Sequence, residues 1–201
     1  MRRALLLATL VVAACATAPS ACRADEDPDR EESLPFYVPS QAKLQFAGNI
    51  GLLSAGGGWS WWHRTVDLDL LFGWVPPMQG DDPIYIGTLK VTGWPVELDL
   101  GDDWNLRPIS AGGTVSLTFG DDYWIFLPDR YPSKYYWASS AVRFGAFVGG
   151  SVGRSYGVPR NVDFYWEVGV TDLELWIFLE NPRQITFWDV LHVALGVSVG
   201  F

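Results

Sequence analysis

Apolar side chains occupy every second position along several segments of this chain. In residues 191–201 the odd positions are all apolar and the even ones are small or polar. Because successive side chains on a strand point to opposite faces, this alternation predicts a strand with one apolar face. The same pattern predicts seven further strands, over about 42–52, 61–74, 84–92, 106–119, 136–149, 162–171 and 173–179.

The predicted fold class is all-β, an up-and-down antiparallel barrel of eight strands. Ten strands is the alternative, if residues 123–127 and a partner form a hairpin of their own. The run Gly56–Gly57–Gly58 is expected to turn the chain between the first two strands.

Residues 61–74 show the alternation most clearly. Trp62, Leu70 and Trp74 belong to an apolar stripe, and Asp67 and Asp69 lie on the opposite face. Tryptophan at both ends of an apolar stripe is typical of lipid-facing residues between the two interfacial belts of a transmembrane barrel. We therefore expect the apolar face to point outward and the charged face to point into the lumen.

Composition favours the same class of protein. The chain has 201 residues, 18% charged and 15% aromatic, with eleven tryptophans. Beyond the first residues no apolar run reaches the ~18 residues of a spanning helix, so insertion into a membrane requires strands closed into a barrel. A net charge of −9 and a pI near 4.5 argue against a nucleic-acid partner.

The N-terminal region is predicted to direct export. Residues 1–24 combine two arginines with the apolar run 4–14 and small residues suited to cleavage, as in a Sec signal peptide. A lipoprotein signal ending before Cys15 is the alternative. Residues 25–41 are acidic and proline-containing, which predicts a flexible periplasmic tail before a barrel over 42–201.

Two resemblances support this interpretation. The end of the chain, with Val197, Val199 and a final Phe201, resembles the terminal strand of bacterial outer-membrane barrels, which carries their assembly signal. Residues 49–56, 106–132 and 172–175 resemble a family of small, uncharacterised outer-membrane barrels of Gram-negative bacteria. The resemblance implies the outer membrane as location, and its lipids and assembly machinery as partners. It implies no activity.

Charged residues on the inward faces predict a lumen closed by ion pairs. An eight-stranded barrel is just wide enough for its own side chains to fill it, and buried charges must pair. Asp67 and Asp69 are expected between strands that carry Lys43 and Lys90, and Arg143 is expected beside Asp163 and Glu167.

His63 is the candidate for catalysis, with Ser54 and Ser60 as nucleophiles for acyl chemistry on lipid A or phospholipid. The predicted topology places His63 near the outer mouth. Asp67 lies four residues along the strand, roughly 13 Å away, which is too far to orient the imidazole. His63 and His192 alone fall short of a zinc site, so neither a metal nor a cofactor is predicted.

The sequence thus predicts a barrel with a structural or interaction role in the cell envelope. A lipid-modifying enzyme that uses His63 is one alternative. A secreted soluble barrel that binds an apolar ligand inside, with the faces inverted, is the other.

Overall fold

The computed structural model describes residues 37–62, 64–77, 82–120, 123–124, 139–157 and 161–201. All of them belong to one unit, Pro35–Phe201. The predicted signal peptide and residues 25–36 of the predicted tail lie outside the described residues. The elements in chain order are β1 (Gln41–Ala47), β2 (Leu53–Trp61), β3 (Val66–Val75), β4 (Ile84–Gly93), β5 (Leu98–Gly101), β6 (Trp104–Phe119), β7 (Val142–Ser155), β8 (Asn161–Thr171), α2 (Asp172–Glu180), η1 (Phe187–Val190) and β9 (His192–Gly200).

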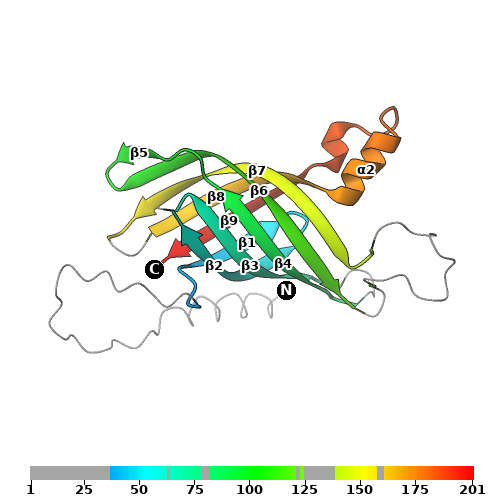
Figure 1. Cartoon of the computed structure of the whole chain (residues 1–201), viewed down its shortest axis with the longest axis horizontal. Coiled ribbons are helices and arrows are strands. Elements are labelled where there is room, and N and C mark those ends of the chain that lie inside the picture. Colours follow the sequence, from blue (N-terminus) through cyan, green and yellow to red (C-terminus); the bar gives the residue numbers. More distant parts are fainter. Residues whose placement is uncertain (1–36, 63, 78–81, 121–122, 125–138, 158–160) are drawn as a thin grey trace. The chain divides into compact units, whose positions relative to one another are not determined.

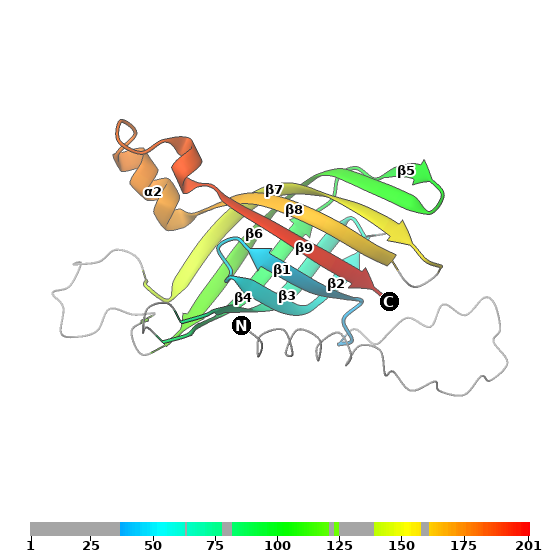
Figure 2. The same cartoon turned by 180° about the vertical axis from the view of Figure 1, so that it is seen from behind.

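Eight of these strands form a closed antiparallel barrel with up-and-down topology (Figure 1). Its order is β4-β3-β2-β1-β9-β8-β7-β6, and pairing of β4 with β6 closes the ring. β5 pairs with the first residues of β6 and lies outside the ring. Seen from behind, the last strand, β9, lies between β1 and β8 and pairs with both (Figure 2). The predicted all-β barrel of eight strands is confirmed.

Two of the predicted strands are wrong. The prediction misses β2 and counts a helix as a strand, so the number of strands stays at eight. Residues 42–52 do not form one strand, because Ala47 and Gly48 adopt positive φ angles of 62° and 80° and the chain turns back into β2. Gly56–Gly58 lie within β2 rather than in a turn. Residues 173–179 belong to the helix α2, not to a strand.

The predicted orientation of the faces agrees with the structure. On β9, Val193, Leu195 and Val197 are exposed on the outer surface, whereas Ala194 and Ser198 are buried. β3 alternates in the same way, with Leu70 and Phe72 outside and Asp69 fully buried. The apolar side chains are therefore on the outside of the barrel and the charged ones are inside.

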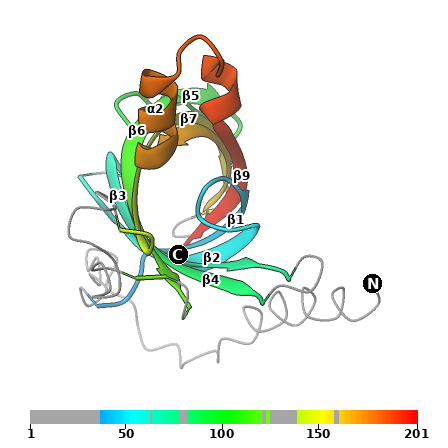
Figure 3. The same cartoon turned by 90° about the vertical axis from the view of Figure 1, so that its right-hand side faces the viewer.

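The two ends of the barrel differ. The end that holds Gln41 and Gly200 also holds the β2–β3 turn (62–65), the β5–β6 hairpin and the connection 156–160. The opposite end holds the connections 48–52, 76–83, 120–141 and 172–191, the last of which contains α2 and η1. We call these the terminal end and the α2 end. Figure 3 looks along the barrel from the α2 end.

Candidate functional site

The lumen of the barrel is filled by a hydrogen-bonded network of charged side chains. Lys43 on β1 lies between two carboxylates of β3, with its Nζ 3.2 Å from Asp67 Oδ2 and 2.7 Å from Asp69 Oδ2. The amide nitrogen of Gln41 also donates to Asp69 Oδ1 at 3.0 Å. Because the barrel pairs β1 with β2 and β2 with β3, these groups meet inside the ring across the glycines of β2.

Lys90 on β4 forms the centre of the network. Its Nζ donates to both oxygens of Glu167 at 2.6 Å and to Oε1 of Gln45 at 3.0 Å. The ammonium also lies 5.1 Å from the ring centroid of Tyr165 and 4.8 Å from that of Phe147. Lys90 is 1% exposed. Three acceptor oxygens and two aromatic rings surround this buried cation and stabilise its charge in place of water.

Asp163 forms ion pairs with two arginines near the terminal end. Arg64, in the β2–β3 turn, reaches Asp163 Oδ2 at 2.6 Å, and Arg107 on β6 lies 3.2 Å from Oδ1. The turn that carries Arg64 and the strand β8 lie on opposite sides of the ring, so this pair spans the lumen. The Trp94 indole lies 4.6 Å from the Arg107 guanidinium and donates to Asp67 Oδ2 at 3.0 Å.

These ion pairs balance in charge. Four cations meet four carboxylates: Lys43, Arg64, Lys90 and Arg107 against Asp67, Asp69, Asp163 and Glu167. Apart from Arg64, whose side chain is 30% exposed, the side chains of all members are at most 7% exposed. A balanced, buried network fills the barrel without leaving a net charge to attract ions of one sign.

Glycine provides the room for the large lumen side chains. Gly58 lies directly opposite Asp69 across the strand pair, Gly153 opposite Asp163, and Gly196 opposite Tyr165. A Cβ at any of these glycines would overlap the side chain opposite. The glycines of the strands therefore help to pack this lumen network, which we call the plug.

The predicted partners of Arg143 are wrong. Its Nη1 donates to the backbone carbonyls of Ser139 and Val142, rather than to Asp163 or Glu167. The other six predicted residues, Lys43, Asp67, Asp69, Lys90, Asp163 and Glu167, are all in the network, although Lys90 pairs with Glu167 rather than with the aspartates of β3.

Sequence reasoning missed Arg107 because the alternation on β6 changes phase. The register of β6 against β7 shifts between Arg107 and Ser110, where β6 has one extra residue. Counting back from Val115, which points outward, would place Arg107 outside the barrel. Pro108 is the signal that was available, since proline within a strand marks a bulge or an edge.

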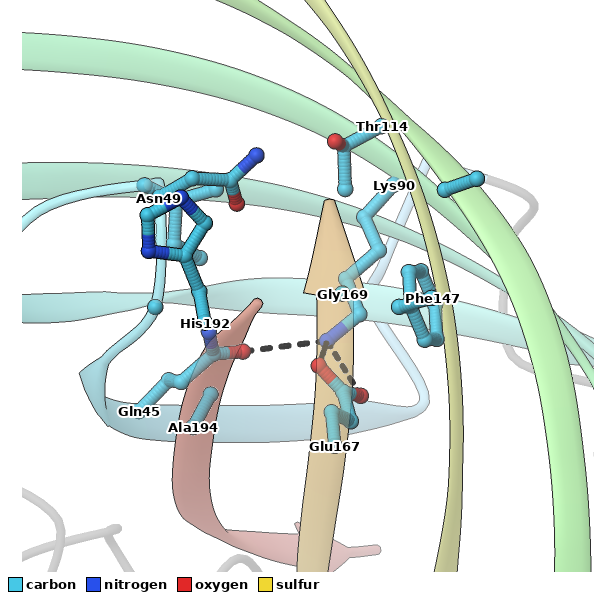
Figure 4. Close-up of a pocket in the computed structure, with 12 residues that line it drawn as sticks. Gln45, Asn49, Lys90, Thr114, Phe147, Glu167, Gly169, His192 and Ala194 are labelled. Carbon is cyan, nitrogen blue, oxygen red and sulfur yellow. Dashed lines mark hydrogen bonds and ion pairs between the residues drawn. The ribbon is translucent and has the colours of Figure 1, made fainter. Parts of the chain in front are cut away.

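The lumen is open at the α2 end, where a pocket lies above the Lys90–Glu167 pair (Figure 4). About 330 Å³ of its space is free of protein atoms and partly continuous with solvent. Asn49, Thr114, Phe147 and His192 are among its lining residues. The β1–β2 loop bends into the ring here (Figure 3), and Ile50 is 1% exposed. The pocket is therefore a blind cup whose floor is the ion-paired network.

The candidate nucleophiles do not form one site. Ser54 is the second residue of β2, near the α2 end, and donates to the carbonyl of Ile50. Ser60 lies near the terminal end and donates to Asp67. Six residues of strand separate them, roughly 20 Å. His63 lies outside the described residues. Its neighbours Trp62 and Arg64 belong to the β2–β3 turn, which lies at the same end of the barrel as Gln41. The predicted topology put this segment at the opposite end from the start of the first strand, and that placement was wrong because the missed strand β2 reverses the chain once more.

His192 begins β9 at the rim of the cup. Its Nε2 lies 2.5 Å from Glu174 Oε2 on α2. Among the described residues, no group of three or more His, Cys, Asp or Glu side chains could hold a metal ion.

Comparison with known proteins adds no relative. The chain matches no protein-family model, no curated protein and no solved structure. In the part of the chain that the structure describes, no helix has the length and apolar character needed to cross a membrane.

Proposed function

We propose that this chain is an exported β-barrel of the bacterial outer membrane, with a lumen closed by ion pairs and a structural or interaction role in the cell envelope. The observation that carries the proposal is the inside-out distribution of side chains. Charged groups of the strands are buried in the lumen, while large apolar groups such as Leu70, Phe144 and Val148 are each more than half exposed on the outer surface.

The lengths of the strands and the positions of the exposed aromatic residues fit a barrel that spans a bilayer. Most ring strands have 9–16 residues, and a tilted transmembrane strand needs about 9–11. Exposed aromatic side chains lie toward the terminal end, including Trp61 and Trp104, and toward the α2 end, including Trp74 and Phe119. Two aromatic girdles around an apolar band are characteristic of outer-membrane barrels.

The connections support an orientation. Outer-membrane barrels have short periplasmic turns and longer extracellular loops. The terminal end has the tight turn 62–65, and the α2 end has the connections 120–141 and 172–191. We therefore place the terminal end in the periplasm and the α2 end outside. Sec export through residues 1–24, with Cys15 as the alternative processing site, and recognition of Phe201 by the assembly machinery belong to this proposal.

Neither alternative function has comparable support. A soluble barrel with an apolar ligand inside would need an apolar lumen, whereas this lumen holds eight ion-paired groups. A lipid-modifying enzyme would need a free nucleophile beside His63. Ser54 lies at the other end of the barrel from the turn that contains His63. Ser60 lies at the same end as this turn, but its hydroxyl donates to Asp67 of the lumen network.

Conductance in a planar lipid bilayer tests the closed lumen. The folded wild type is expected to give no steady current, because side chains fill the barrel. A variant with Arg64→Ala, Lys90→Ala, Asp163→Ala and Glu167→Ala removes both ion pairs that cross the lumen. Shown to be folded by its unheated mobility on a gel, it is expected to conduct. Steady channels from the wild type would contradict a closed lumen.

A further inference from the structure

The connection between β8 and β9 carries an apolar surface that the other described residues leave exposed. We call residues 172–190 the α2–η1 segment. None of the residues of α2 is buried. Large apolar side chains on the segment are exposed, from 38% at Ile177 to 79% at Trp188, the others being Leu175, Trp176, Leu179 and Phe187.

The two helices of the segment pack on each other, and α2 also contacts β7 and β8 at the rim of the barrel. The rings of Phe178 and Phe187 meet edge to face at 5.9 Å, and Phe187 contacts Trp188 in the same way at 6.3 Å. An isolated helix of this length is marginal in water, and a helix that is apolar on all sides is normally buried. Burial of these side chains would therefore stabilise the segment, and the residues that the structure describes do not provide it.

Three of its four carboxylates have hydrogen-bond partners in or beside the segment. Asp172 accepts from the Leu173 amide, and Glu174 accepts from the Thr171 hydroxyl and lies against His192. Hydrogen bonds from the Thr186 hydroxyl and amide lower the pKa of Asp189. The last turn of α2 has no basic residue. The whole segment has four carboxylates and one cation, Arg183, so its net charge is negative and does not favour anionic surfaces. Burial of apolar area is then what would drive binding.

The position of the segment identifies what covers it. α2 begins directly after Thr171, the last residue of β8, and η1 ends two residues before His192, the first of β9. The outer faces of these neighbouring strands are apolar, with Phe164, Trp166 and Leu195 exposed. Figures 1 and 3 show α2 at the rim of the barrel, beyond β7 and β8, with the middle of the ring left clear. The apolar surface of the barrel wall therefore continues onto the segment.

We infer that the α2–η1 segment lies in the headgroup and acyl boundary of the same bilayer that the barrel spans, and binds lipid through the exposed side chains of Trp176, Leu179 and Trp188. This inference rests on the proposed function. An interfacial helix buries its apolar side chains about 5–10 Å into the boundary between headgroups and acyl chains. Because the interaction is apolar, it requires no anionic lipid and is insensitive to salt.

Single cysteines with a polarity-sensitive fluorophore test the inference in the full chain, with Cys15→Ser and Cys22→Ser as background. Leu179→Cys and Trp188→Cys probe the segment, Leu195→Cys probes the barrel wall, and Gln184→Cys probes the exposed turn between the two helices. Each variant is reconstituted into phosphatidylcholine bilayers and shown to be folded. Quenching by nitroxide on lipid acyl chains is then compared with quenching by aqueous iodide.

We expect the labels at 179 and 188 to be blue-shifted and quenched by lipid nitroxide, like the label at 195, while iodide quenches the label at 184. Iodide quenching at 179 and 188 with lipid quenching at 195 would overturn the inference and leave the spanning barrel intact. Iodide quenching at 195 would overturn the spanning barrel itself. Shielding at 179 and 188 that is lost on dilution of the protein in lipid would identify a second copy as the covering, and would overturn the lipid assignment.

Discussion

Several large side chains of the lumen network, including Asp69, Asp163 and Tyr165, depend on a glycine opposite them. Tyr165 is 3% exposed, its hydroxyl donates to Gln45 Oε1 at 3.2 Å, and its ring lies over Gly196. In a barrel of eight strands the lumen has room for one large side chain at each such position and not for two. The small residues of the inward faces are therefore as much part of the plug as the charges.

Gly196→Ala tests this dependence. The new Cβ would overlap the Tyr165 ring, and overpacking of this kind costs about 1–3 kcal/mol. Urea unfolding of the barrel in lipid vesicles, followed by tryptophan fluorescence, measures the loss. Gly113→Ala is the matched control, because the nearest atom to its Cβ, the carbonyl oxygen of Gly145, would be 3.4 Å away. Equal stability of the two variants would contradict the packing argument.

Lys90→Met tests the ion pairs. Removing the ammonium leaves the Glu167 carboxylate buried without its cation, and breaking a buried pair in this way costs about 3–5 kcal/mol. The double variant Lys90→Met, Glu167→Leu removes both charges, so it should recover most of the stability in the same unfolding assay.

Arg143→Met is the control for the lysine variant, because its guanidinium bonds carbonyl oxygens and is not in the network. We expect a smaller loss of stability from it. A double variant no more stable than Lys90→Met alone would contradict the view that the unpaired carboxylate carries the cost.

At the scale of elements, the alternation predicts the strands wherever pairing partners and faces are regular. It fails at β2, because three consecutive glycines are typical of a turn. They form a strand here because β1 and β3 pair with β2 on both sides, and a Cβ at Gly56 would strike the backbone of Leu70. That close approach is a property of the assembled sheet and cannot be seen in the local sequence.

The helix α2 could have been predicted. Its apolar residues alternate as in a strand, at Leu173, Leu175, Ile177 and Leu179. A capping box over residues 171–174 nevertheless indicates a helix. Thr171 accepts from the Glu174 amide, and Glu174 accepts from the Thr171 amide. Thr-x-x-Glu ahead of an apolar run is a signature of a helix start, and it decides between two periodicities that the apolar positions alone leave open.

Thr171→Ala tests the capping box. Loss of an N-cap hydroxyl costs about 0.5–2 kcal/mol of helix stability, so we expect faster hydrogen exchange at the amides of residues 173–176. Exchange in β1 and β9 should not change, since α2 lies outside the ring. Unchanged exchange in α2 would contradict the role of the cap.

At the scale of the whole molecule, the long-range part of the plug was not predictable. The sequence shows which faces carry charge, and this was enough to bring together Lys43, Asp67 and Asp69. The pair between Arg64 and Asp163 joins residues 99 apart in the chain, from opposite sides of the ring. Such partners depend on ring closure and on the bulge in β6, and no local pattern encodes either.

The central claim, that this barrel spans a membrane, is tested most directly by the mobility of the protein on a gel with and without heating. Outer-membrane fractions would be taken from cells that produce the wild type or a variant lacking Phe201, whose amide donates to Ser40 O at 3.0 Å where β9 meets the start of β1. The account predicts that the wild type is in this fraction and migrates faster unheated than boiled, and that the variant fails to assemble. A wild type that is absent from the membrane fraction and unshifted by heating would contradict it.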